Sequence, residues 1–213
     1  MNYREFGNKG LKISEIVFGA GAVGGLIIRK DPDTRHQAFE EALKLGINWV
    51  DTAPAYGDGL SEQHLGEILP SFSDYELYIS SKIQIRQEHL PDISGTIKKS
   101  LENTLRRLNK ESIDLIQLHT PVTEVRGSFK GSASHNSLGI NDVLGKKGVL
   151  ESLSELKQTG IARLVGFTGF GDTTALKKMA RTEEFDSIQV YYNVLNPSAG
   201  TKVPDIFTAH DYD

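Results

Sequence analysis

The stretch Ile47-Asn48-Trp49-Val50-Asp51 is a short apolar run that ends in a carboxylate. Runs of this kind alternate along the chain with amphipathic helical segments, and that alternation is typical of a parallel α/β protein. Two later runs also end in polar groups: residues 76–82 end in the ammonium of Lys82, and residues 113–118 end at His119. Because the carboxyl ends of the strands share one rim in a (β/α) barrel, these groups are expected to converge.

The rest of the chain follows the same rhythm and predicts six parallel strands preceded by a β-hairpin. Residues 2–6 and 11–14 flank Gly7-Asn8-Lys9-Gly10, a turn signal that favours the hairpin. The other parallel strands are expected over residues 16–18, 47–51, 162–168 and 187–192. The helices are expected over residues 33–46 (with Asp33 as N-cap), 61–69, 92–109, 149–158 and 172–181. A Gly/Ser-rich loop is expected over residues 120–148, and no convincing element after residue 196.

The composition favours one cytoplasmic domain over residues 1–213. The chain has 24 Lys and Arg against 28 Asp and Glu, a net charge of −4, which does not suggest a nucleic-acid or anionic membrane partner. It has no cysteine, so disulfides and thiolate sites are excluded. No apolar stretch approaches the roughly 18 residues of a membrane span, and the histidines show no metal-ligand spacing, so no metal site is predicted.

Taken singly, the polar residues at the strand ends have plainer interpretations. Asp51 alone would be a turn or N-cap residue, and Lys82 a solvated strand end. His119 would be a core or rim histidine, and Tyr56 a packed loop aromatic. A buried charge is costly unless it is paired, so an Asp–Lys contact at neighbouring strand ends is both permitted and required. The joint arrangement therefore favours a functional site.

These residues lie in motifs that resemble those of the aldo-keto reductases. Asp51-Thr52-Ala53-Pro54-Ala55-Tyr56-Gly57 resembles the DTAxxYG signature of that family, and residues 61–66 resemble the SE-x-x-LG run that follows it. Ile79-Ser80-Ser81-Lys82 resembles the strand that carries the family lysine, and residues 114–119 the strand that carries the histidine. Residues 6–21 are similar to a branch that contains aldose dehydrogenases and potassium-channel β-subunits.

The resemblance implies a TIM (β/α)8-type barrel that uses NADPH, or less often NADH, to interconvert an aldehyde or ketone and its alcohol. Tyr56 would donate the proton, and the ammonium of Lys82 would favour the phenolate that remains. Asp51 would pair with Lys82 and hold it in place. His119 would donate a hydrogen bond to the carbonyl oxygen. The expected partner is a small-molecule carbonyl or alcohol, such as a sugar.

The same resemblance implies a set of cofactor contacts. Gly21 and Ala22 would lie against the nicotinamide ribose, and Gln189 would bond the nicotinamide carboxamide. Thr168-Gly169 stands where the family usually has Ser-Asn, so the hydroxyl is kept and an amide side chain is lost. The full expected set lies on several strand ends: Gly21, Ala22, Asp51, Thr168, Gly169 and Gln189.

Two other classes of protein compete with this interpretation. Residues 19–24 spell G-x-G-x-x-G after a strand, which is the dinucleotide fingerprint of a Rossmann dehydrogenase. That fold requires a helix that starts in the glycine loop, whereas Pro32 places the predicted start some ten residues later. The second alternative is a cofactor-sensing or inactive barrel that binds NADPH without turnover.

The length raises a further expectation. A (β/α)8 barrel takes about 250 residues, and only six parallel strands are predicted before residue 193. We therefore expect a barrel that lacks its last two βα units, as a fragment, half of a split protein or a short gene product. The two edge strands of such a sheet would be exposed to association.

Overall fold

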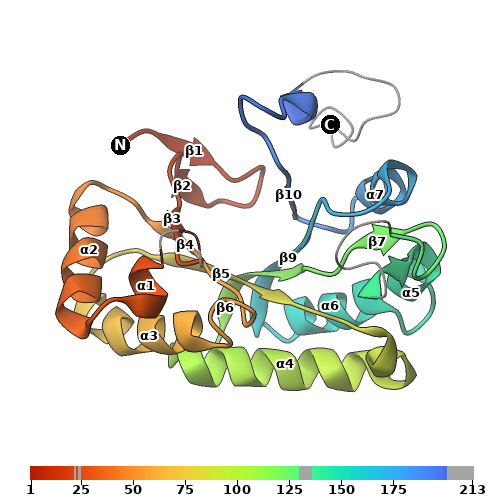
Figure 1. The fold of residues 1–213 in the computed structure, drawn as a ribbon, viewed down its shortest axis with the longest axis horizontal. Coiled ribbons are helices and arrows are strands. Elements are labelled where there is room, and N and C mark those ends of the chain that lie inside the picture. The colour runs from red at the N-terminus through yellow and green to blue at the C-terminus, as the bar shows by residue number, and fades with distance from the viewer. Residues whose placement is uncertain (22, 24, 130–135, 201–213) are drawn as a thin grey trace. The chain divides into compact units, whose positions relative to one another are not determined.

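The computed structural model describes residues 1–213 except 22, 24, 130–135 and 201–213 (Figure 1). The chain divides into two compact units, each of which is built from two separate segments. The first unit consists of Met1–Lys82 and Leu101–Leu115. The second consists of Ile83–Ser100 and Ile116–Asp213.

The first unit begins with an antiparallel hairpin in which Tyr3 pairs with Ser14 and Glu5 with Lys12, as the turn signal predicts. Parallel strands and their connecting helices follow. In chain order the elements are β1 (Tyr3–Glu5), β2 (Lys12–Ser14), β3 (Phe18–Gly19), α1 (Leu26–Arg29), α2 (Pro32–Lys44), β4 (Trp49–Asp51), α3 (Leu60–Ile68), the 3-10 helix η1 (Leu69–Phe72) and β5 (Tyr78–Ile83).

The second unit continues the alternation of strands and helices. The long helix α4 begins in this unit and ends in the first, since its residues up to Ser100 are counted here and those from Leu101 there. The elements are η2 (Gln87–Asp92), α4 (Ile93–Leu108), β6 (Ile113–Leu118), β7 (Val122–Thr123), β8 (Leu138–Gly139), α5 (Ile140–Leu144), α6 (Val149–Gln158), β9 (Ala162–Thr168), α7 (Thr173–Ala180), β10 (Ser187–Gln189) and η4 (Ser198–Gly200).

Six strands form one parallel sheet whose spatial order is β3-β4-β5-β6-β9-β10, the order in which they occur in the chain. Strands that are added successively to one side, with a helix after each, build a (β/α) barrel, and the expected fold class of six parallel strands with an N-terminal hairpin is confirmed. In a Rossmann sheet the first three strands are added to one side and the later strands to the other side of the first strand. The described strands are all added to the same side, so the Rossmann alternative is wrong.

Aromatic and aliphatic side chains form the core of each unit. In the first unit, the ring of Phe39 in α2 lies 5.1 Å from that of Phe18 and 5.4 Å from that of Phe72. In the second unit, the apolar face of α6, with Val149 and Leu153 buried, packs against β9. Burial of such side chains contributes roughly 1.5–3 kcal/mol each. Both units therefore have apolar cores that hold the strand ends in place.

Several element bounds differ from the sequence prediction, for local reasons. Helix α2 begins at Pro32 because Asp31, rather than Asp33, accepts the hydrogen bond of the Thr34 N–H at 3.0 Å as N-cap. The short helix α1 directly follows the glycine-rich segment and was not expected; Gly25, with φ 61°, precedes it. The expected loop over residues 120–148 contains β7, β8 and α5.

The last strand is shorter than predicted. It ends at Gln189 rather than at residue 192, and Tyr191 and Tyr192 are 68% and 67% exposed. Val194 and Leu195 beyond them are more than 90% exposed. A strand needs a partner to continue its ladder, and among the described residues only β9 pairs with β10. The apolar run therefore leaves the sheet early.

Candidate active site

The first unit brings a buried ion pair to the carboxyl end of its strands. Lys82 near the end of β5 is 1% exposed, and its Nζ lies 2.6 Å from Oδ2 of Asp51 at the end of β4. The same Nζ donates to the carbonyl oxygen of Thr52 at 2.9 Å. An ammonium this deeply buried would be costly without these acceptors. The charged groups of Asp51 and Lys82, which the sequence predicts to converge, therefore do lie in contact.

Tyr56 joins this pair from the loop between β4 and α3. The Nζ of Lys82 lies 4.8 Å from the centroid of its ring. The loop is closed tightly, because the Tyr56 N–H donates to Ala53 O and the Ser61 N–H donates to Tyr56 O. Gly57, with φ 64°, lies so close to Ile28 that an added Cβ would come within 2.7 Å of Cγ2. The sequence DTAxxYG therefore folds as a compact turn that presents its phenol beside the ammonium.

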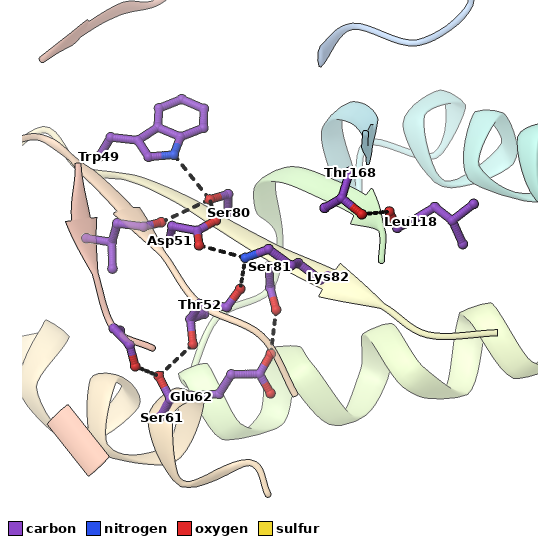
Figure 2. A network of polar contacts seen from close by, with 12 residues as sticks. Trp49, Asp51, Thr52, Ser61, Glu62, Ser80, Ser81, Lys82, Leu118 and Thr168 are labelled. Carbon is purple, nitrogen blue, oxygen red and sulfur yellow. Dashed lines mark hydrogen bonds and ion pairs between the residues drawn. The ribbon is translucent and has the colours of Figure 1, made fainter. Parts of the chain in front are cut away.

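The second carboxylate oxygen of Asp51 is bound by a serine (Figure 2). Ser80 Oγ lies 3.0 Å from Asp51 Oδ1, and the two residues are register partners in the parallel pairing of β4 with β5. The indole Nε1 of Trp49 donates to the same Ser80 Oγ at 3.1 Å. The motif had pointed to Asp51 and Lys82 but gave Trp49 and Ser80 no role.

Two hydroxyl groups fasten the glycine-rich segment to the Asp51 strand end. Ser61 Oγ donates to Ala20 O at 2.8 Å and lies 2.7 Å from Thr52 Oγ1. Because the serine hydroxyl has one proton, which is directed at Ala20, Thr52 is the donor to Ser61. Gly21 follows directly, and an added Cβ would lie 3.5 Å from the Tyr56 ring, which is ordinary contact. Gly21 therefore lies beside the phenol ring, whereas Ala22 lies outside the described residues.

A buried carboxylate supports the other face of β5. Glu62 in α3 is fully buried, and its Oε1 accepts from Ser81 Oγ at 2.6 Å and from Thr104 Oγ1 at 3.0 Å. Its Oε2 accepts from Arg107 Nε at 2.7 Å. Figure 2 shows Ser81 and Ser80 on opposite sides of the strand, as side-chain alternation requires. Glu62 thus joins α3, α4 and β5 behind the ion pair.

The other expected site residues belong to the second unit. His119 directly follows β6, and its N–H donates to Ile83 O at 2.8 Å. Thr168 ends β9, and its hydroxyl donates to Leu118 O at 3.2 Å (Figure 2). The Gly169 N–H donates to Gln189 O at 2.8 Å, and Gln189 ends β10 with its side chain exposed. The second unit therefore places these residues at the carboxyl ends of successive strands.

Gly169 lies against the side chain of Val190. A Cβ at this position would lie 2.9 Å from Cγ1 of Val190 and 3.6 Å from Gln189 O. The Val190 side chain would have to move to admit it, whereas the Gln189 oxygen is at ordinary contact distance.

The described residues contain no group of three or more His, Asp or Glu side chains that could hold a metal ion. Within the same part of the chain, no helix is both long and apolar enough to cross a membrane.

Comparison with known proteins supports one family. The model of the aldo/keto reductase family matches residues 15–212. L-Galactose dehydrogenase of Arabidopsis thaliana is 31% identical over 170 residues, which cover 78% of this chain and 48% of the plant protein. Pyridoxine 4-dehydrogenase of Escherichia coli is 26% identical over 207 residues, or 93% of this chain and 66% of the bacterial protein.

A solved structure agrees with these relatives. The holo form of aldo-keto reductase AKR11C1 from Bacillus halodurans superposes with a TM-score of 0.67 at 28% identity. The match covers 90% of this chain and 58% of that structure. The chain thus spans about half to two thirds of the length of the proteins that it matches.

Proposed function

The chain belongs to the aldo/keto reductase family, and from that premise we propose that it interconverts an aldehyde or ketone and its alcohol with NADPH or NADH. The observation that carries this proposal is the buried ammonium of Lys82, which lies between the carboxylate of Asp51 and the ring of Tyr56. A phenol beside a buried cation is suited to releasing a proton, because the cation stabilises the phenolate that remains. Reduction of a carbonyl requires such a proton at the oxygen.

In this proposal Tyr56 is the proton donor and Lys82 its electrostatic partner. Tyr56 gives its phenolic proton to the substrate oxygen as that oxygen gains negative charge. Asp51 holds the ammonium of the almost fully buried Lys82 at 2.6 Å and offsets the cost of burying that cation. The family resemblance also implies that His119, in the second unit, donates a hydrogen bond to the carbonyl oxygen and so orients the carbonyl. Bound NADPH or NADH supplies the hydride that reaches the carbonyl carbon.

The residues proposed to hold the cofactor fit such a group in three respects. Gly21 has no side chain beyond its backbone and lies beside the Tyr56 ring, where we propose that the nicotinamide ribose binds. The exposed amide of Gln189 is available to the nicotinamide carboxamide. Thr168 uses its proton on Leu118, so its oxygen is left to accept a hydrogen bond.

The proposed substrate is a small hydroxylated carbonyl compound or the corresponding alcohol. Two of the related proteins are named for L-galactose and pyridoxine, both small molecules with several hydroxyl groups. This chain spans 48% and 66% of those proteins, so the proposal names this class of substrate and no single compound.

The test is turnover of NADPH with an aromatic aldehyde, and of NADP with L-galactose, followed by nicotinamide absorbance. We expect consumption or formation of NADPH that Tyr56→Phe lowers by about a hundredfold or more. Equal rates for parent and Tyr56→Phe would overturn the proton-donor assignment. Quenching of NADPH fluorescence without consumption would instead identify a cofactor-sensing protein.

A further inference from the structure

We propose that Ser80, which accepts a hydrogen bond from the indole of Trp49, is a positioning residue. It fixes the Asp51 carboxylate in the orientation that binds the ammonium of Lys82. This inference rests on the proposed reductase function, since it concerns the same proton-donating site. Ser80 touches neither the phenol nor the ammonium in any described contact, so its action passes through Asp51.

The strand geometry places Ser80 on the side of β5 that carries the ion pair. Ser80 and Lys82 are two residues apart, so their side chains leave the same face of the strand. Both reach Asp51, Ser80 at Oδ1 over 3.0 Å and Lys82 at Oδ2 over 2.6 Å. The carboxylate is thereby held at both oxygens, and its rotation about the Cβ–Cγ bond would break both contacts.

Proton counting fixes the direction of the hydrogen bonds. An indole N–H can only donate, so Trp49 occupies one lone pair of Ser80 Oγ at 3.1 Å. The single hydroxyl proton of Ser80 then has two acceptors in reach, Asp51 Oδ1 at 3.0 Å and Val50 O at 3.2 Å. A charged carboxylate is the stronger acceptor. The proton therefore goes to Asp51, and the chain of bonds runs from Trp49 through Ser80 to the ion pair.

Burial makes the loss of either hydrogen bond of Ser80 costly. Ser80 is 1% exposed and Trp49 is 5% exposed, so water does not readily replace a lost partner. Removal of the Ser80 hydroxyl leaves the indole N–H without its acceptor and Asp51 Oδ1 without its donor. Among the described contacts the carboxylate is then held only at Oδ2, by Lys82, and is free to rotate about the Cβ–Cγ bond.

The neighbouring serine offers a matched control. Ser81 is also buried, but its hydroxyl donates to Glu62 on the opposite side of the strand. Ser80→Ala and Ser81→Ala therefore remove the same atom from adjacent residues of β5, and only the first breaks a bond to Asp51.

The experiment compares the two variants by turnover and by fluorescence. Trp49 is the single tryptophan of the chain, so its emission reports on this site alone. We expect Ser80→Ala to lower kcat about tenfold with KM little changed, and to shift the Trp49 emission to shorter wavelength. Ser81→Ala should leave kcat within about twofold and the emission unchanged. Unaltered kcat in Ser80→Ala, or an equal fall in both variants, would overturn the proposal.

A second arm separates this inference from the proposed function. Asp51→Ala removes a negative charge that is two hydrogen bonds away from the indole, so the Trp49 emission should shift in that variant too, through the lost field of the carboxylate. If the parent turns over no substrate, the proposed reductase function fails. The Trp49 emission of Asp51→Ala and Ser80→Ala still reports whether hydrogen bonds link Trp49 through Ser80 to Asp51. No emission shift in either variant would overturn the connection itself.

Discussion

Arg107 of α4 donates from Nε to Oε2 of Glu62 at 2.7 Å, and the carboxylate that it binds is fully buried. The Arg107 side chain is only a quarter exposed, so the pair lies just beneath the solvent-accessible surface. Thr104 and Ser81 complete the coordination of Glu62 Oε1. The pair joins two helices at residues 45 positions apart in the chain.

Arg107→Ala is therefore expected to destabilise the protein. It leaves a buried carboxylate with two hydroxyl donors and no cation, a change that costs about 3 kcal/mol. The measurement is the urea midpoint of unfolding. Arg106→Ala is the control, because the Arg106 side chain is exposed and bonds only Asn103 among the described contacts. A similar loss in both variants would contradict the argument.

The ion pair between Asp51 and Lys82 predicts a difference between stability and activity. Lys82→Met leaves the Asp51 carboxylate, whose side chain is 13% exposed, without its cation, and should cost about 3 kcal/mol. Adding Asp51→Asn removes the stranded charge, so the double variant should regain most of the lost stability. Turnover should stay about a hundredfold or more below the parent in both. Recovery of turnover in the double variant would contradict the role of Lys82.

Gly66 predicts a steric effect where α3 meets α4. An added Cβ would lie 2.0 Å from the backbone oxygen of Arg107, a contact that cannot be relieved by rotating a side chain. Gly66→Ala should lower the free energy of unfolding by about 3 kcal/mol. Gly19→Ala serves as control, because its Cβ would meet nothing within 4 Å. Comparable denaturation midpoints for the two variants would argue against this close approach.

Asp142 predicts a specific acid sensitivity. Burial acts to raise the pKa of Asp142, but hydrogen bonds from Arg126 and from the Gly139 N–H outweigh it, and the pKa lies below its usual value. A lowered folded-state pKa gives stability that is present above the unfolded pKa of about 4 and is lost as the pH falls through the folded value.

Asp142→Asn should therefore flatten the fall in stability below about pH 4. The measurement is the urea midpoint as a function of pH, compared with the parent. A parent and an Asp142→Asn variant with parallel acid limbs would contradict the prediction.

Elements with strong local patterns could be predicted from the sequence. The bounds of β6, α6 and β9 agree with the prediction to the residue, because each apolar pattern stops at a clear polar or glycine boundary. Strands β7 and β8 have two residues each and pair Val122 with Leu138 across an intervening segment. A two-residue strand is too short to show an alternating apolar pattern, so the sequence predicts a loop where β7 and β8 lie.

The site was predictable to a similar degree. The motif identified Asp51 and Lys82, and the structure joins them at 2.6 Å. The hydrogen bond from Trp49 to Ser80 spans 31 positions and depends on the register of β4 with β5. Spacing along the chain carries no information about such a contact, and the same holds for Glu62 and Arg107. The roles of Tyr56 and His119 stay predictions, and the turnover of Tyr56→Phe tests the first of them.

The distance along the chain between Glu62 and Arg107 also sets an order of events during synthesis. A ribosome delivers the buried carboxylate of Glu62 first, and its cation follows 45 residues later. The segment up to Lys82 contains all of the first unit except Leu101–Leu115. Until those residues follow, the carboxylate of Glu62 lacks the Arg107 cation that it binds in the folded unit. Residues 101–115 must therefore emerge before that unit can close, so the first 82 residues become stable only after a later segment has been made.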